Sequence, residues 1–420
     1  MNATPKATLL KKLLAGSLLF YVFSGVSSIL NYIFYPIVAR FVTTSQYGEI
    51  QFLVSMFTQL AVGFVVLNIL AIVISAQIKN HKEQLEAIKS LNVVSCIVIL
   101  VIVIIGSVIL YTNKTSLGLS DGAAIIALGL SLVINVPFTV AIGHLQGNGH
   151  FMASGVLSTL GSFLKLVFSV IFIMMGFGVA GAILGIGVGM LITLILVEIV
   201  NKRTADPKPK TSFIPTKAMF KRLVFIRERA IIAIIALTVI TLLSSADSIV
   251  SRLFFDTHSA GQYAAVATLA KVILAATSPL MWLALPPAVS RDRQRIMTFL
   301  SITAAISFSA CIIFSLAPTF FLQTLLGIDA GAFVSILPLA SIAMALCSIA
   351  FVLVSVSVCL GTLRNLFLSS LAAIASYFIV FLTLQLSLGS LYGSLYGQIV
   401  ASLCFITGGL LALRSRHFTS

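Results

Sequence analysis

The sequence is short of acidic residues and short of charge as a whole. Only 9% of its 420 residues are charged, and 11 Asp and Glu stand against 26 Lys and Arg, which gives a formal net charge of +15. Soluble domains carry roughly 25% charged residues, so this composition excludes an ordinary soluble globular protein. Hydrophobic residues make up 59% of the chain, and the shortage of charge therefore indicates a membrane protein.

Other absences exclude several kinds of chemistry. The sequence has five cysteines, all in apolar stretches and without metal-ligand spacing, so we expect packing residues, no disulfide and no metal site. It has no glycine loop of the kind that cradles phosphates, so ATP is not expected as the direct energy source and no cofactor is predicted. The loops predicted on the outer side are short and leave no room for the catalytic cluster of a membrane polymerase or acyltransferase. We therefore expect that the protein is not an enzyme.

What the sequence does contain is a series of apolar stretches, most of them near or above the roughly 20 residues that a helix needs to cross a bilayer. Lipid cannot satisfy free backbone donors and acceptors, so each stretch is predicted to be a helix. The twelve predicted spans are 13–39, 50–76, 91–111, 122–143, 152–175, 177–200, 230–255, 260–285, 296–326, 332–360, 366–388 and 389–413.

The basic residues predict the orientation of these spans. With the N-terminus inside, twenty-one of the 26 Lys and Arg fall in cytoplasmic segments, three (Arg40, Lys114 and Arg252) fall near the outer side, and Lys165 and Lys271 remain within the membrane. This asymmetry predicts a multi-pass membrane protein with both termini cytoplasmic. It also explains the net charge through orientation and attraction to anionic membrane lipids, so no nucleic-acid partner is expected.

The chain is predicted to have two similar halves. An N-terminal lobe of six helices (1–200) and a C-terminal lobe of six helices (230–420) are separated by a cytoplasmic linker (201–229) that contains the run KRTADPKPK. Arg40 matches Arg252 at an offset of 212 residues, and Gly48 matches Gly261 at 213. An internal duplication with an even number of helices relates the lobes by a pseudo-two-fold axis along the membrane normal, with a substrate path expected between them.

Three segments carry a resemblance to a known family. Residues 243–273 (LSSADSIVSRLFFDTHSAGQYAAVATLAKVI) are similar to the seventh and eighth helices of polysaccharide flippases, and residues 28–50 and 145–151 (LQGNGHF) resemble the first helix with its loop and the turn before helix five. The chain resembles the Wzx-type O-antigen and capsule-repeat flippases of the multidrug, oligosaccharidyl-lipid and polysaccharide exporter superfamily. The resemblance implies an all-α, MATE-like fold of twelve transmembrane helices. It also implies a location in the bacterial inner (cytoplasmic) membrane and lipopolysaccharide or polysaccharide biosynthesis as the process, with other membrane proteins of polysaccharide assembly as partners.

Four basic residues are candidates for substrate binding. A charge within the membrane costs about 2.5–3.5 kcal/mol on insertion scales, so each needs a partner, water or a function. We predict that Arg40, Lys165, Arg252 and Lys271 bind the diphosphate of a polyprenyl-diphosphate-linked oligosaccharide. For Arg40 and Arg252 the alternative is snorkelling to lipid phosphates. For Lys165 and Lys271 it is a structural ion pair.

Asp247 is the one acid placed deep in a predicted span. It stands at a depth similar to that of Lys271 on the neighbouring helix, so one hypothesis is a structural bridge to Lys271 or Arg252. The other is that Asp247 couples transport to a proton or sodium ion. The predicted function is alternating-access flipping of the lipid-linked oligosaccharide from the inner to the outer leaflet. The alternative is a cation-coupled multidrug or toxic compound antiporter of the same fold, which would be expected to carry more acid than base in the membrane.

Overall fold

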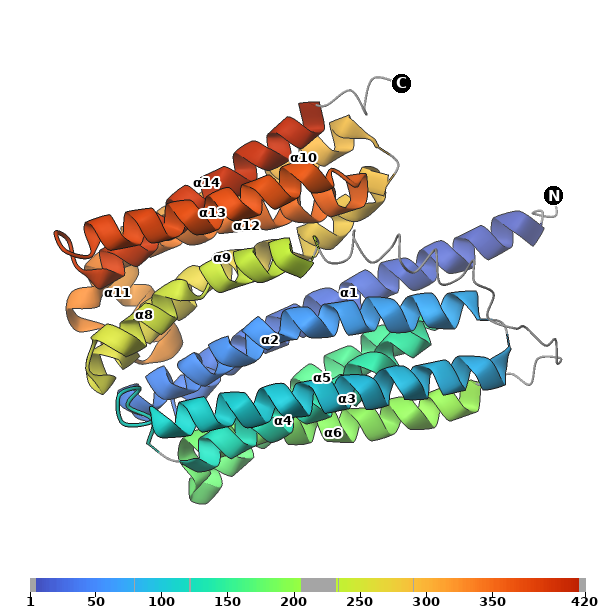
Figure 1. Cartoon of the computed structure of the whole chain (residues 1–420), viewed down its shortest axis with the longest axis horizontal. Helices are drawn as coiled ribbons and strands as arrows, with labels where there is room; N and C mark the ends of the chain where they lie inside the picture. Colours follow the sequence, from blue (N-terminus) through green and yellow to red (C-terminus); the bar gives the residue numbers. More distant parts are fainter. Residues whose placement is uncertain are drawn as a thin grey trace. The chain divides into compact units, whose positions relative to one another are not determined.

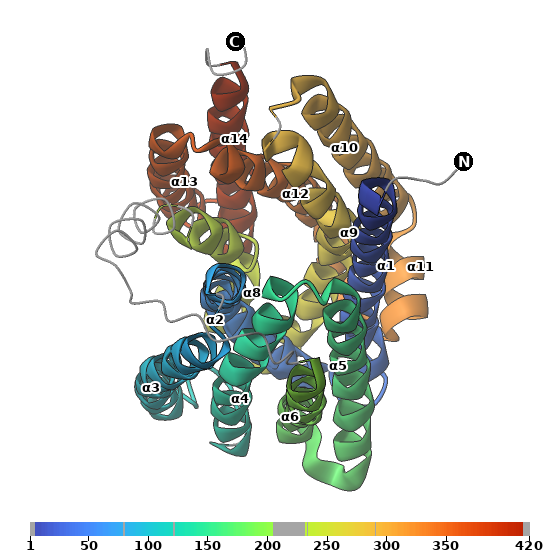
Figure 2. The same ribbon diagram turned by 90° about the vertical axis from the view of Figure 1, so that its right-hand side faces the viewer.

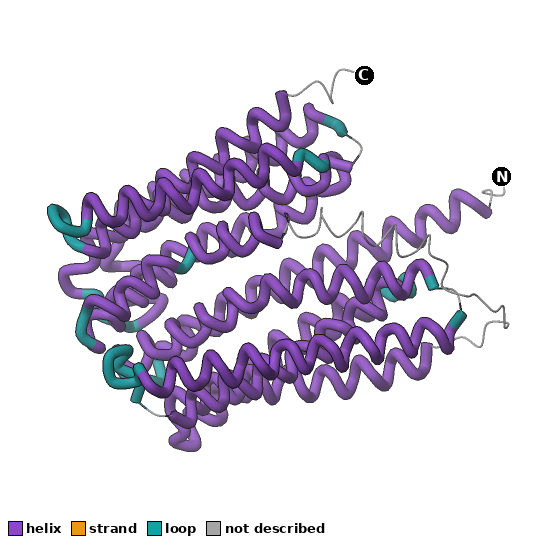
Figure 3. Tube along the Cα trace, viewed as in Figure 1, coloured by secondary structure: helices purple, strands orange, loops and turns teal. Residues whose placement is uncertain are grey.

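The computed structural model describes residues 5–78, 80–120, 122–204, 232, 234–289 and 291–414, and the part of the chain that it describes is helical without any strand (Figures 1 and 3). The helices of the first half are α1 (Pro5–Ala39), α2 (Thr44–Gln77), α3 (His81–Thr112), α4 (Gly122–Gly147), α5 (Phe151–Phe172) and α6 (Gly178–Thr204). Those of the second half are helix Ile234–Leu243, α8 (Ala246–Phe254), α9 (Thr257–Val289), α10 (Arg293–Leu316), α11 (Pro318–Phe321), α12 (Leu337–Leu360), α13 (Leu363–Leu384) and α14 (Ser390–Arg414).

The described helices accommodate the twelve predicted crossings. Ten stretches are long and apolar enough to cross a membrane, and an eleventh is the bent pair Ile234–Leu243 and Ala246–Phe254. One of the ten, Phe151–Lys202, is 52 residues long and contains both α5 and α6. The chain reverses between them at Gly176, whose φ of 90° belongs to the region that glycine adopts readily. The all-α, multi-pass architecture is therefore confirmed.

Contacts divide the chain into two compact units. The first comprises Met1–Phe34, Gly63–Lys114 and Asp121–Ile214, and the second comprises Tyr35–Val62, Thr115–Ser120 and Pro215–Ser420. The end of α1, the start of α2 and the α3–α4 loop thus group with the second half of the sequence. The predicted lobes stay a prediction, and most of the predicted linker, 205–229, lies outside the described residues.

In the first unit, α5 packs on α6, and α4 packs on both α3 and α6 (Figure 2). Glycines of α6 allow α5 to come very close. A Cβ at Gly185 would stand 2.2 Å from the backbone nitrogen of Ser169, and one at Gly189 would stand 2.4 Å from that of Lys165. Glycine at these two positions therefore fixes the depth and rotation at which α5 presents Lys165.

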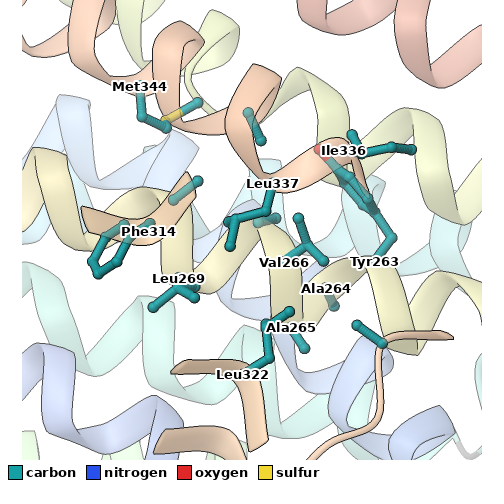
Figure 4. Close-up of a cluster of buried hydrophobic side chains, with 14 of the residues drawn as sticks. Tyr263, Ala264, Ala265, Val266, Leu269, Phe314, Leu322, Ile336, Leu337 and Met344 are labelled. Atoms are coloured by element: carbon teal, nitrogen blue, oxygen red, sulfur yellow. The ribbon is translucent and has the colours of Figure 1, made fainter. Parts of the chain in front are cut away.

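The core of the second unit is built around α9. Tyr263, Val266 and Leu269 on this helix gather with Leu337 and Met344 of α12 in an apolar cluster whose members are almost fully buried (Figure 4). Burying side chains of this size contributes about 1.5–3 kcal/mol each. This packing makes α9 a rigid support for the polar groups near its N-terminal end.

The predicted span 230–255 is not one continuous helix, because the helix breaks at Ser244 and Ser245 with a bend of 47°. The amide of Ser245 bonds to Leu242 O instead of continuing the regular ladder to Thr241. The carbonyl of Thr241 accepts from Gln59 Nε2 at 3.2 Å and from Ser244 Oγ at 2.7 Å. Side chains that insert into the hydrogen-bond ladder kink a helix, and here they start a new helix, α8, just before Asp247.

The predicted span 296–326 is also too long. Helix α10 ends at Leu316, and Pro318 begins the short helix α11, which is followed by a π-helical turn, Leu322–Leu326. Proline inside a helix removes a hydrogen bond and clashes with the preceding turn, so the chain leaves α10 here. The residues on both sides of Pro318 are apolar, so hydrophobicity alone did not predict the end of α10.

Candidate substrate and ion sites

Lys165 lies in the first unit, where polar side chains of α1 and α5 are joined by hydrogen bonds. Ser27 and Asn31 follow each other at one helical turn on α1, and Ser162 and Lys165 do so on α5. Asn31 Nδ2 donates to Ser27 O at 2.9 Å and to Ser162 Oγ at 3.0 Å, and Asn31 Oδ1 accepts from Lys165 Nζ. The amide of Asn31 therefore holds the ammonium in place.

The environment of Lys165 contains no acidic partner among the described residues. The half-buried ammonium stands 4.9 Å from the centre of the Phe34 ring, whose face attracts a cation. An ammonium has three donors, and Asn31 is its one hydrogen-bond acceptor in the described part of the chain. The remaining donors and the uncompensated charge can both serve an anion, whereas the alternative of a structural ion pair has no support here.

Asp247 lies in the second unit, in the first turn of α8, where the helix N-terminus favours negative charge. It is 1% exposed. Tyr263 Oη donates to Oδ2 at 2.6 Å, and Gln398 Nε2 donates to Oδ1 at 3.1 Å. The second amide atom, Gln398 Oε1, is buried and has no hydrogen-bond partner among the described residues. A carboxylate, a phenol oxygen and an amide group thus meet at one buried point.

Lys271 on α9 is near Asp247 but does not pair with it in the described structure. Its half-buried Nζ donates to Ser248 Oγ at 2.9 Å, one residue further along α8. No ion pair of Asp247 with Lys271 or Arg252 occurs among the described residues. The polar groups of Tyr263 and Gln398 satisfy Asp247 in place of the bridge that the sequence suggested.

The two arginines bind backbone carbonyls at the end of the second unit that is predicted to be outer. Arg40 is exposed and donates through Nη2 to Thr324 O at 3.0 Å. Arg252 is only 3% exposed and donates through Nε to Leu117 O at 2.6 Å and through Nη2 to Gly118 O. Both guanidinium groups are therefore held by hydrogen bonds to the backbone of this chain.

Sequence reasoning missed the residues that support the charged groups. Asn31 and Gln398 each interrupt an apolar span, and a buried amide needs hydrogen-bond partners, so both could have been flagged. Tyr263 belongs to the segment 243–273 that carries the family resemblance, but a resemblance does not state which acid a tyrosine contacts. Phe34 carried no signal, because aromatic residues are common in membrane spans.

The fold defines a class of protein. The chain has the architecture of multidrug and toxic compound extrusion (MATE) transporters. It matches a substituted form of the Vibrio cholerae MATE transporter VcmN at a TM-score of 0.63 and 18% identity, over 99% of each chain. It matches the lipid II flippase MurJ in an inward closed conformation at 0.68 and 14%, over 94% of this chain and 87% of that one. A Pyrococcus furiosus transporter of the same superfamily, noted for a binding pocket of reverse polarity, matches at 0.61 and 16%, over 99% and 100%.

The family follows from the sequence itself. Residues 13–293, well over half of the chain, match the family model described as polysaccharide biosynthesis protein, and the chain belongs to this family. No curated protein sequence is similar enough to be matched. The family match and the MurJ-like and MATE-like fold together confirm the resemblance to Wzx-type flippases of the exporter superfamily.

Proposed function

We propose that the protein is a flippase that moves polyprenyl-diphosphate-linked oligosaccharide repeat units from the inner to the outer leaflet of the bacterial cytoplasmic membrane by alternating access. Both termini would be cytoplasmic, and the products would serve O-antigen or another surface polysaccharide. The proposal is supported by membership of the polysaccharide biosynthesis family. It is supported equally by the chemistry of the basic residues in the membrane.

The observation that carries the proposal is the state of Lys165. Its ammonium is held by Asn31 and lies against Phe34, and no carboxylate of the described residues neutralises it. An unneutralised cation inside a membrane is costly, so it is retained where a ligand supplies the opposite charge. At ~4 Å and an effective dielectric near 20, one phosphate contact gives roughly 4 kcal/mol of attraction before desolvation. We propose that Lys271, and Arg40 and Arg252 once released from their carbonyls, also meet the diphosphate.

Asp247 is proposed as the coupling site for a proton or a sodium ion. Its carboxylate is buried, two hydrogen bonds hold it, and Gln398 contributes an unpartnered amide oxygen beside it. A proton would convert the carboxylate into a neutral acid, and a sodium ion would take oxygen ligands of this kind. Either event changes the charge of α8, which also carries Ser248, the partner of Lys271.

An experiment on Asn31 tests the substrate proposal. Replacing Asn31 with Asp retains the size of the side chain but places a carboxylate against Lys165, so the two charges neutralise each other. In reconstituted vesicles, Asn31→Asp should reduce flipping of a fluorescent polyprenyl-diphosphate oligosaccharide about as strongly as Lys165→Gln does.

The matched control is the single variant Asn31→Gln, which lengthens the amide without adding charge and should retain more activity. Undiminished flipping in Asn31→Asp would contradict the proposal, because a neutralised lysine could not attract the diphosphate.

The alternative function is a cation-coupled multidrug antiporter of the same fold, and the buried Asp247 is the observation that favours it. The two functions differ in the sign of the cargo. Export of a quaternary ammonium compound that is lost in Asp247→Asn but unchanged in Lys165→Gln would favour the antiporter over the flippase.

A further inference from the structure

Arg40 and Arg252 each bind a loop in the other half of the sequence, within the second unit. Arg40 follows α1 and donates to Thr324 O in the segment between α10 and α12. Arg252, near the end of α8, donates to Leu117 O and Gly118 O in the loop between α3 and α4. In each case a guanidinium that ends the first helix of one half holds a carbonyl of the loop that follows the third helix of the other half.

These two contacts are reciprocal. Arg40 and Arg252 occupy matching places in the internal repeat, 212 residues apart. Each binds the segment that follows the third helix of the opposite half, although Thr324 lies five residues before the position that matches Leu117. In a two-fold interface each contact occurs twice, once in each direction. A duplicated chain can build the same kind of interface from its own halves, and this pair of contacts has that pattern.

Two repeat-related glycines also bring the backbones of α2 and α9 together. A Cβ at Gly48, in the first turns of α2, would stand 2.7 Å from Gly261 Cα, and a Cβ at Gly261, at the start of α9, would stand 2.0 Å from Thr44 O. The two helix starts therefore meet backbone against backbone. No side chain could be added at this point without moving them apart.

The loop held by Arg252 is shaped for the contact. Gly118 has a φ of +60°, and a Cβ there would stand 2.4 Å from Thr257 Cγ2 and 3.3 Å from Arg252 Nη2. Two residues later, the amide of Ser120 donates to Glu49 Oε1 at 3.0 Å. The α3–α4 loop is thus held by hydrogen bonds to Arg252 of α8 and to Glu49 of α2.

We propose that Arg40 and Arg252 form a reciprocal clasp that closes the outer side of the transporter by binding loop carbonyls of the opposite half. The clasp comprises these two guanidinium groups, their acceptors at Thr324, Leu117 and Gly118, and the contact between Gly48 and Gly261. The idea of an outer side that opens rests on the proposed function. The donors that hold carbonyls in the closed clasp cannot hold a phosphate at the same time, so opening the clasp would free them for the departing anion.

The two arginines should contribute unequally. Arg252 is almost completely buried and uses two donors, whereas Arg40 is exposed to solvent and uses one. A buried hydrogen bond to a charged group contributes more than an exposed one, because its loss leaves the carbonyls without a partner. Loss of Arg252 should therefore open the clasp further than loss of Arg40.

The clasp can be tested by thiol labelling without any substrate. Ser55 is 4% exposed and lies seven residues after Gly48 on α2, which places it on the same face, two turns deeper. In Ser55→Cys, a membrane-impermeant maleimide added on the outer side of right-side-out vesicles should react slowly. Adding Arg252→Gln should speed the reaction about tenfold, in line with the strength of charged hydrogen bonds. Arg40→Gln should speed it less, and the two changes together most. The chain with only its native cysteines gives the background.

Two controls separate opening from loss of fold. Arg364→Gln removes the same charge from an exposed position at the start of α13 and should leave the Ser55→Cys rate unchanged. Ser307→Cys, at a fully buried position of α10, should stay unlabelled in the presence of Arg252→Gln. The proposal is overturned if adding Arg252→Gln and Arg40→Gln leaves the labelling rate of Ser55→Cys unchanged. It is also overturned if Arg364→Gln speeds the labelling of Ser55→Cys by the same factor, or if Arg252→Gln speeds the labelling of Ser307→Cys by that factor. Because the readout needs no glycan, it stands or falls independently of the flippase assay.

Discussion

The charged sites of the two units differ in sign, in exposure and in how they are satisfied. In the first unit the ammonium of Lys165 is half-buried, and a neutral amide holds it. In the second unit the carboxylate of Asp247 is 1% exposed and accepts hydrogen bonds from Tyr263 and Gln398. A charge whose needs are met inside the protein can be stable without a ligand. The ammonium of Lys165 is held in place but not neutralised, so it is suited to bind an anionic ligand.

The largest effect is expected at Lys165, because a neutral amide holds its ammonium in place and no carboxylate of the described residues balances its charge. Lys165→Gln should lower flipping of a lipid-linked oligosaccharide at least about tenfold, since a charged contact to phosphate is lost. Lys165→Arg should retain part of the activity. The measurement is flipping in reconstituted vesicles at matched protein amounts. Equal loss in both variants would mean that the shape of this side chain matters more than its charge, and the contrast with Asp247 would disappear.

The next effect is expected at Asp247. Asp247→Asn retains the size of the side chain but removes the charge, so we expect gradient-driven flipping to stop while binding of the anionic substrate is unchanged or tighter. Stability should fall by about 1–3 kcal/mol, because an amide cannot accept both hydrogen bonds.

Tyr263→Phe provides the comparison for Asp247→Asn. It removes one hydrogen bond and retains the carboxylate, so it should lower the thermal stability and preserve coupling. Full gradient-driven flipping in Asp247→Asn would return this residue to a structural role.

Two glycines of α2, Gly48 near its start and Gly63 in its interior, offer a smaller and cleaner contrast. A Cβ at Gly48 would meet Gly261 Cα at 2.7 Å, whereas nothing lies within 4 Å of a Cβ at Gly63. Gly48→Ala should destabilise the protein by about 1–3 kcal/mol through overpacking. Gly63→Ala should stabilise it by about 0.5–1 kcal/mol, because alanine loses less backbone entropy in a helix. Thermal unfolding in one detergent measures both, and similar shifts would argue against a tight contact at Gly48.

The smallest effect is expected at Asp256, in the loop between α8 and α9. Hydrogen bonds from Ser259 hold the pKa of this carboxyl below its ordinary value. A lowered pKa in the folded state stabilises the protein above the ordinary pKa of Asp, and this contribution is lost as the pH falls through the lowered value. Asp256→Asn should therefore reduce the melting temperature slightly at neutral pH, and the difference should vanish in strong acid. A difference that is independent of pH would show that the charge of Asp256 contributes nothing.

The sequence by itself determined the membrane class, the positions of most helices and the resemblance to flippases, and it predicted an internal repeat. These features depend on composition and spacing, because lipid allows only chains whose backbone bonds are satisfied within each span. It also identified Lys165 and Asp247 as unusual, since a charge in an apolar stretch is visible without a fold.

Only the tertiary structure decided which groups these charges meet. Asn31 lies 134 residues before Lys165, and Gln398 lies 151 residues after Asp247, so neither pairing leaves a local pattern. The break at Ser244 and Ser245 depends on Gln59, a side chain from another helix that takes the carbonyl of Thr241. The carbonyls that Arg40 and Arg252 bind are backbone groups that every residue has, so the residue types in the sequence could not predict these contacts. Contacts of this kind exist only after distant helices have packed, because packing sets which donor reaches which acceptor.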